Sequence, residues 1–172
     1  MEYAQEDYTR HYIITALFKL MNDYDYNEIK VTDIVRKAGV GRATFYRYFK
    51  SKDDILIYYF ERTARDYQSN QHLYPRCKDD YIKVVCDIMN KFKENKEPLK
   101  LIKKARLEGL YLDYLNKNFA NLFDLSYSNM NSYTPYLYAG MLFNISMQWL
   151  DKNCEENPET LAQVIVDAIY DK

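Results

Sequence analysis

Apolar residues recur at helical spacing along most of the chain. Between residues 4 and 24, for example, the repeat runs through Ile13, Leu17 and Leu20 at steps of three or four. This is the period of one buried helix face, and no segment shows the strict apolar–polar alternation of a half-buried strand. Helix-breaking residues are also rare, with 4 glycines and 4 prolines in 172 residues. The pattern therefore predicts an all-α protein of about nine helices.

After the first helix, the same period predicts three more helices. Two short ones are expected at residues 31–38 and 42–49. Ser51 is a suitable cap for a longer fourth helix, because a serine followed by acidic residues is typical of a helix start. This helix is expected to continue past Tyr67 and to end in a loop at residues 68–78.

The next two helices are predicted from their end signals. Asp79 or Asp80 is expected to cap a fifth helix, which the polar run at residues 93–97 ends. Pro98 is expected at the first position of a sixth helix, where its missing N–H group is not needed.

Gly109 is expected to break the sixth helix. A seventh helix is then predicted at residues 110–125, followed by a polar loop at 126–132. Pro135 and Pro158, each preceded by a capping residue type, are expected to start the last two helices.

Residues 31–49 combine two short helices with a tight turn. Thr32 is placed to cap the first helix. Gly39 lies where the helix must end with positive φ, which glycine adopts without steric cost. Val40 is an apolar residue inside the turn, and it is best explained as a plug between two crossing helices.

The second of these helices has a polar face that suits DNA. Phe45 and Phe49 are four residues apart and can share the buried face. The outward positions then carry arginine, which pairs with guanine, threonine, whose methyl group can contact thymine, and tyrosine, whose hydroxyl can hold a phosphate. The predicted DNA-binding residues are Thr32, Arg42, Ala43, Thr44, Tyr46, Arg47, Tyr48 and Lys52.

These residues resemble the helix-turn-helix of the TetR family of bacterial transcription regulators. The similarity runs from about Thr9 to Leu56, and it rests on the turn at residues 38–40, the aromatic run after it and Lys52. The chain departs from the family pattern at Gly41, where a polar residue such as serine is usual. In this family Thr9 and Arg10 often approach a phosphate, although an ordinary exposed helix end explains them equally well.

The resemblance also implies a ligand pocket in the C-terminal part and release from DNA by a small apolar or aromatic effector. Aromatic side chains at helical spacing are equally typical of a plain apolar core, and that alternative stays open. The candidate pocket residues are Phe92, Tyr111, Tyr114, Phe119 and Trp149.

The last two predicted helices are apolar over a wider arc than one buried face requires. This favours a two-fold homodimer with a four-helix interface, and hence an operator that is an inverted repeat. The alternative is that these residues only close the core of one chain. The candidate interface residues are Met141, Leu142, Ile145, Trp149, Leu161, Val164, Ile165 and Ala168.

The net charge is close to zero, but the charged residues are unevenly distributed along the chain. The net charge is −1, yet residues 30–52 carry seven lysines and arginines against the single acid Asp33. From residue 53 onward the count is 15 basic to 18 acidic. A basic patch confined to the helix-turn-helix is typical of a DNA footprint.

Other kinds of site find no support in the sequence. His11 and His72 have no partner at ligand spacing, so neither a metal nor another cofactor is expected. No phosphate-binding loop or nucleophile motif occurs, so an enzyme is not expected. Three scattered cysteines suit a reducing cytoplasm, and we see neither a signal peptide nor a membrane span.

Together these features predict a two-domain cytoplasmic regulator. Residues 1–52 would form the DNA-binding domain and residues 53–172 an effector-binding and dimerisation domain. The expected function is transcriptional repression. The alternatives are an activator or co-activator that docks a protein, and a small helical enzyme or carrier with a vestigial motif. The intact set of outward motif residues argues against the enzyme or carrier.

Overall fold

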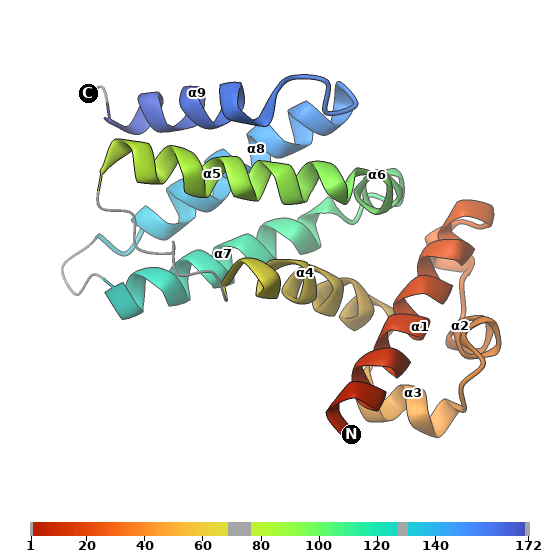
Figure 1. Cartoon of the computed structure of the whole chain (residues 1–172). Helices are drawn as coiled ribbons and strands as arrows, with labels where there is room; N and C mark the ends of the chain where they lie inside the picture. Colours follow the sequence, from red (N-terminus) through yellow and green to blue (C-terminus); the bar gives the residue numbers. More distant parts are fainter. Residues whose placement is uncertain (1, 69–76, 127–130, 171–172) are drawn as a thin grey trace.

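The structure is a computed structural model. It describes the backbone of residues 2–68, 77–126 and 131–170, and the side chains of residues 8–64, 77–121 and 131–169. Over these residues the chain forms nine α-helices and one short 3-10 turn, with no strand (Figure 1). The all-α prediction is confirmed.

The helices follow one another with short connections. The first four are α1 (Glu2–Asp23), α2 (Val31–Ala38), α3 (Arg42–Tyr48) and α4 (Lys52–Gln68), and a 3-10 turn at Tyr26–Glu28 lies between α1 and α2. The other five are α5 (Lys78–Glu94), α6 (Lys96–Lys104), α7 (Glu108–Ser126), α8 (Thr134–Asp151) and α9 (Pro158–Tyr170). The loops expected at 68–78 and 126–132 fall largely on residues 69–76 and 127–130, which lie outside the described part.

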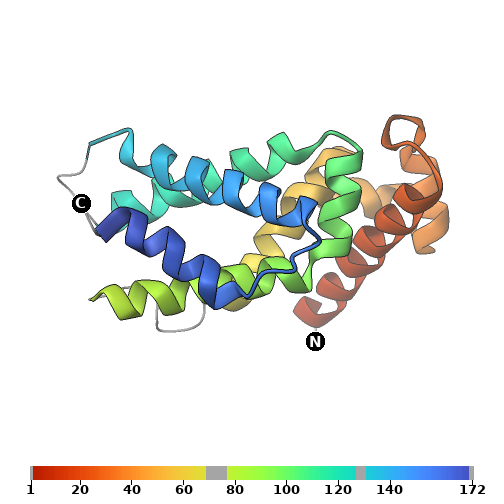
Figure 2. The same ribbon diagram turned by 90° about the horizontal axis from the view of Figure 1, so that it is seen from above.

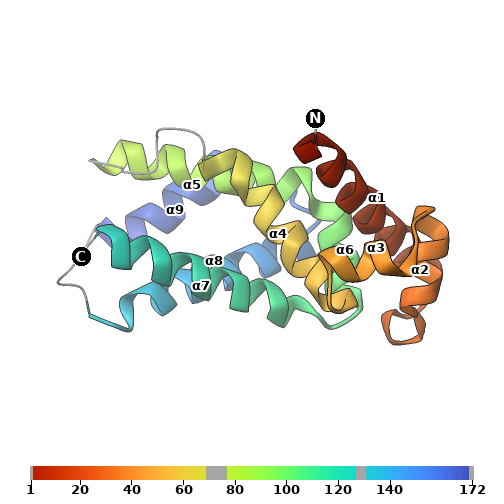
Figure 3. The same cartoon turned by 90° about the horizontal axis from the view of Figure 1, so that it is seen from below.

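The molecule is elongated, with α1, α2 and α3 grouped at one end (Figures 1 and 2). At the other end α5 packs along α9, and α7 packs along α8. Figure 3 shows α4 crossing between the two groups, and it packs on α1 at one end and on α7 at the other. α4 is therefore the mechanical link between the two ends of the chain.

One apolar core runs through both groups of helices. At the α1–α3 end it includes Leu17 and Phe45, whose side chains are fully buried. It continues through Leu56 of α4 to Met89 of α5 and Trp149 of α8. Because the core is continuous, movement of one group of helices must change the packing of α4.

Several local predictions are confirmed. Gly39 ends α2 in the left-handed region, at φ 68°. The Ser51 hydroxyl accepts the backbone N–H of Asp54 at 3.2 Å, which makes it the cap expected for α4. α8 begins at Thr134 with Pro135 in its first turn, and α9 begins at Pro158.

Two predicted caps are wrong. The N-cap of α2 is Lys30, so Thr32 lies within the first turn, where Asp33 accepts the Lys30 N–H at 3.2 Å. The N-cap of α5 is Cys77, not Asp79 or Asp80. In both cases the helix starts two or three residues earlier than the polar signal, because each added residue gains a backbone hydrogen bond even without a side-chain cap.

The break between α6 and α7 also differs from the prediction. Gly109 lies in the first turn of α7, and the chain turns instead at residues 105–107, where Arg106 has φ 58°. Pro98 is the third residue of α6 rather than its first. That position is equally acceptable for proline, because the N–H groups of the first helical turn have no partner within the helix.

Candidate DNA-binding site

Buried aromatic residues fix the position of α3. Phe45 is completely buried, and Phe49, directly after the helix, is 3% exposed. Their ring centroids lie 6.0 Å apart. Val40, in the turn before α3, packs against the same core, as its predicted role as a plug requires. These contacts leave the opposite side of α3 free of the core.

The outward face of α3 is polar and cationic. Arg42, Ala43, Tyr46 and Arg47 are exposed, with Tyr46 at 58%. No salt bridge involves either arginine within the described part of the chain. Two guanidinium groups beside a small alanine match the donor pattern and close approach that a DNA groove requires.

Three other predicted DNA contacts are less exposed. Thr44 and Tyr48 are half-buried on the flank of α3, and Thr32 is half-buried at the start of α2. The Arg10 guanidinium of α1 lies 4.9 Å from the centroid of the Tyr48 ring and 5.1 Å from that of Tyr58. This stacking places a further cation beside α3 and holds the Tyr48 ring.

Lys52 lies in a different environment from the one predicted. Its ammonium group donates hydrogen bonds to the backbone carbonyls of Tyr26 and Ile29, the second at 3.1 Å. It also lies 4.1 Å from the centroid of the Tyr26 ring. Burial lowers the pKa of Lys52. Lys52 thus joins the start of α4 to the segment before α2, and a phosphate would have to compete with these carbonyls.

Tyr26 completes this junction, although no sequence pattern marks it as a site residue. Its hydroxyl donates to the Asp53 carboxylate at 2.5 Å, and the residue is 6% exposed. Burial, and then the hydrogen bond to Asp53, raise the pKa of Tyr26. A tyrosine and a carboxylate 27 residues apart have no periodic relation, so only the folded chain reveals this contact.

The local excess of positive charge remains on the surface. Besides the two arginines of α3, Lys30, Lys37 and Lys50 are exposed. Arg36 is also exposed, but it pairs with Asp33 at 2.9 Å. The charge pattern of the sequence therefore becomes a cationic surface around α3, as electrostatic attraction of DNA requires.

Four of the five predicted pocket residues form one series of ring contacts, whereas the Phe119 ring stacks on Tyr138. The Phe92 and Trp149 rings stack with centroids 6.1 Å apart, and Tyr111 and Tyr114 stack at 6.4 Å. Phe92, Tyr111 and Trp149 are buried, whereas Tyr114 and Phe119 are half-buried. Burial raises the pKa of Tyr111, and it raises that of Tyr114 to about 12. These contacts are those of a core, and ligand binding by these five residues stays a prediction.

The predicted interface residues divide into two groups. Leu142, Trp149 and Ile165 are buried within one chain, at 5%, 2% and 2% exposure, so their side chains are not presented to a second copy. Val164 and Ala168 are exposed on α9, and the remaining three are half-buried, namely Met141, Ile145 and Leu161. Leu137 and Tyr136, near the start of α8, are also exposed, and they were not among the predicted interface residues.

No group of three or more histidine, cysteine, aspartate or glutamate side chains with the geometry to hold a metal occurs among the described residues. His72 lies outside them. None of the described helices is long and apolar enough to cross a membrane.

Comparison with known proteins agrees with this geometry. Residues 13–59 match the family described as bacterial regulatory proteins, tetR family. An HTH-type transcriptional regulator of Staphylococcus aureus (strain bovine RF122 / ET3-1) is 28% identical over 121 residues. The match covers 66% of this chain and 63% of that regulator.

Solved structures share the fold over nearly the whole chain. The protein Lin0861 of Listeria innocua gives a TM-score of 0.78 at 20% identity, covering 96% of this chain and 91% of its own. A TetR-family transcriptional regulator of Syntrophomonas wolfei gives 0.64 at 19% identity, covering 93% and 92%. The regulator FadR of Bacillus subtilis, solved with stearoyl-CoA, gives 0.52 at 18% identity, covering 92% and 96%.

Proposed function

We propose that this chain is a repressor of the tetR family of bacterial regulatory proteins, the family that residues 13–59 match. It would bind a specific DNA sequence as a homodimer in the cytoplasm and have no catalytic activity of its own. The observation that carries the proposal is the exposed face of α3, where Arg42, Ala43 and Arg47 project away from buried Phe45.

In this proposal α3 enters the major groove. Arg42 and Arg47 read base edges, because a guanidinium group can donate two hydrogen bonds to one guanine. Tyr46 and the flanking lysines at 30, 37 and 50 bind phosphates and set the position of the helix. A groove about 12 Å wide admits one α-helix, so a short helix with one free face is sufficient.

The homodimer would form through the outer faces of α8 and α9. Leu137 is 71% exposed and Val164 is 58% exposed. Met141, one turn after Leu137, is half-buried, and Ala168, one turn after Val164, is exposed. These side chains supply an apolar strip on each helix, and a two-fold axis would bring four helices together. The two α3 helices would then face successive turns of DNA.

An effector would release the dimer from DNA by moving α4. This helix begins within the Tyr26–Lys52–Asp53 junction and packs on α7 at its other end. A ligand that binds more tightly to one position of α4 shifts the spacing of the two α3 helices. The fold neighbour FadR of Bacillus subtilis was solved with stearoyl-CoA, whose long acyl chain supports an effector with an apolar group for the present fold.

DNA binding is tested by anisotropy titration of labelled duplex at several salt concentrations. We expect log Kd to rise with log salt with a slope of about 0.9 per phosphate contact. The variant Lys37→Ala should lower this slope by about 0.9, which corresponds to one phosphate contact. Lys104→Ala on distant α6 should leave the slope unchanged. A wild-type protein that retains no duplex at low salt would overturn the proposal.

Repression is tested separately by in vitro transcription from a promoter that carries the bound sequence. We expect less transcript as the protein is added, and recovery of transcript when an effector is present. An increase of transcript on adding the protein would instead identify an activator.

A further inference from the structure

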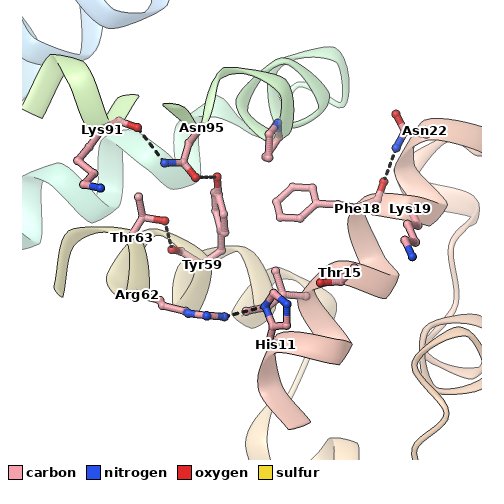
Figure 4. Close-up of a pocket in the computed structure, with 12 residues that line it drawn as sticks. His11, Thr15, Phe18, Lys19, Asn22, Tyr59, Arg62, Thr63, Lys91 and Asn95 are labelled. Atoms are coloured by element: carbon pink, nitrogen blue, oxygen red, sulfur yellow. Dashed lines mark hydrogen bonds between the residues drawn. The ribbon is translucent and has the colours of Figure 1, made fainter. Parts of the chain in front are cut away.

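A cleft of about 450 Å³ lies between the two ends of the molecule (Figure 4). The second half of α1 forms one wall, the middle of α4 the adjoining wall, and the junction of α5 and α6 the third. This volume is within the range of about 300–1,000 Å³ typical of small-molecule sites. The cleft is separate from the aromatic core formed by Phe92, Tyr111 and Trp149.

The side chains around the cleft carry positive charge and no acid. Its lining includes Lys19, Arg62 and Lys91 but neither aspartate nor glutamate. Lys91 pairs with Glu94 at 2.8 Å, outside the lining. Lys19 and Arg62 have no carboxylate within 4.0 Å in the described part of the chain. Two uncompensated cations at one concave site favour an anionic ligand.

The contact between Arg62 and His11 leaves the positive charge of Arg62 intact. Arg62 Nη1 and His11 Nδ1 are 3.0 Å apart, and Figure 4 shows this bond at the α1–α4 corner of the cleft. Because guanidinium can only donate hydrogen bonds, Nδ1 is the acceptor in this contact. His11 therefore orients the Arg62 side chain without neutralising it, and other N–H groups of Arg62 remain for an anion.

The rest of the lining gives the cleft an apolar side. Phe18 and Tyr59 meet edge to face with ring centroids 4.9 Å apart, and Ile14 and Pro98 extend this surface. The Tyr59 hydroxyl is already committed, because it donates to Asn95 Oδ1 at 2.8 Å. This bond fixes α4 against the end of α5, so the wall is formed before any ligand arrives. An aromatic or aliphatic group can pack there beside the two cations.

We propose that this cleft binds a small organic anion that carries an apolar group, with Arg62 as its anion contact and Lys19 adding positive charge at the opposite rim. The binding of this anion does not depend on the proposed function, whereas its effect on DNA affinity rests on that function. α1 belongs to the DNA-binding end, whereas the α5–α6 junction belongs to the other end. A ligand that spans them fixes the angle between the two ends and so changes operator affinity.

Two dyes of the same ring system test the binding. 1-Anilinonaphthalene-8-sulfonate carries the anion, and N-phenyl-1-naphthylamine is the same molecule without it. Each is titrated by fluorescence into wild type, Lys19→Gln, Arg62→Gln and the control Lys104→Gln, which removes one exposed charge from α6 outside the cleft. Circular dichroism is measured for every variant.

We expect Arg62→Gln to bind the sulfonate about tenfold more weakly, because a charge-assisted contact is lost. Lys19→Gln should bind it about threefold more weakly, because only a more distant charge is removed. Binding of the neutral dye should change less than twofold, and Lys104→Gln should match wild type for both dyes. Thr15→Trp, which fills the cleft, should remove binding of both. Sulfonate affinity within twofold of wild type in both cleft variants would overturn the inference.

To test the effect on DNA binding, the sulfonate titration is repeated with the protein bound to operator DNA. Linkage requires the dye to alter DNA affinity by the same factor that DNA alters dye affinity. We expect a factor of at least about three that Arg62→Gln abolishes; equal affinities would overturn the regulatory role. If wild type bound no DNA at all, the proposed function would fail, while the dye comparison would still decide the binding site.

Discussion

Arg42 is the side chain that most directly tests how α3 reads DNA. It is the first residue of α3, it is exposed, and it is not in a salt bridge in the described part of the chain. Arg42→Ala is expected to cost about 1–3 kcal/mol on the preferred duplex, because a bidentate contact to guanine is lost. Anisotropy titration measures the loss.

The same variant should also relax specificity at one position. Duplexes that differ from the preferred one by single base pairs should all bind wild type more weakly, whereas Arg42→Ala should no longer distinguish changes at one pair of each half-site. Lys104→Ala serves as the control for a lost charge far from α3. A uniform loss across all sequences would assign Arg42 to a phosphate instead.

Tyr26 gives a prediction about stability. Tyr26→Phe removes the hydrogen bond to Asp53 and leaves the carboxylate without that donor. We expect the free energy of unfolding in urea to fall by about 1–2 kcal/mol at pH 7, since the acceptor is charged. Tyr24→Phe, at a residue 58% exposed, is the control and should have the stability of wild type.

The Tyr26 contact should also depend on pH. The pKa of Tyr26 is raised in the folded protein above its ordinary value of 10.0, so folding favours the neutral hydroxyl. Its contribution is therefore fully present below pH 10 and is lost as the pH rises above that value. The stability difference between wild type and Tyr26→Phe should be constant up to about pH 10 and shrink as the pH rises above 10. A constant difference would contradict the assignment.

At the scale of helices, the sequence predicted the number and order of the elements correctly. Apolar periodicity marks the helices, and residues such as Gly39 before a turn or Pro158 at a helix start mark their ends. These signals depend on local sterics, so they can be recognised in the sequence. The break between α6 and α7 was predicted at Gly109, but it lies at residues 105–107, where Arg106 adopts positive φ. Residues 105–107 contain neither glycine nor proline, so no local signal marks that turn.

The candidate sites were likewise predictable only where they depend on local sequence. The face of α3 was predictable, since Phe45 and Phe49 define the buried side and the rest follows from helical geometry. Lys52 was placed on the correct helix end, but the carbonyls that hold it belong to a segment more than 20 residues away. The cleft at His11 and Arg62 was not predicted, because its walls come from three separated stretches of sequence.

The prediction of a dimer rests on the exposed apolar side chains of α8 and α9. Leu137→Asp combined with Val164→Asp places charges at two exposed apolar positions without disturbing the core. We expect the double variant to sediment as a monomer at micromolar concentration, whereas wild type sediments as a dimer, because burying an unpaired carboxylate costs several kcal/mol.

A matched control for this experiment is Asn90→Asp, which adds a charge to an exposed position on α5. It should remain dimeric. Ile165 is unsuitable as a test position, since it is 2% exposed and its replacement would damage the core of a single chain. Wild type that is monomeric throughout the micromolar range would contradict the interface.

For the whole molecule, the arrangement of its two ends explains how binding at one site could alter the other. The α1–α3 group carries the cationic face, and α4 passes from this group to α7. The cleft beside α4 contains groups from both ends. DNA recognition and ligand recognition therefore share one helix, and coupling of about 1.4 kcal/mol would be enough to weaken DNA binding tenfold.

The central claim is that α3 reads a specific sequence as part of a two-fold dimer. Its most direct test is selection of bound duplexes from random DNA, run in parallel with wild type and with the double variant Arg42→Ala, Arg47→Ala. We predict that wild type enriches an inverted repeat whose half-sites lie one helical turn or a multiple apart, and that the double variant enriches none. Enrichment of no sequence by wild type, or of the same sequence by both proteins, would contradict the account.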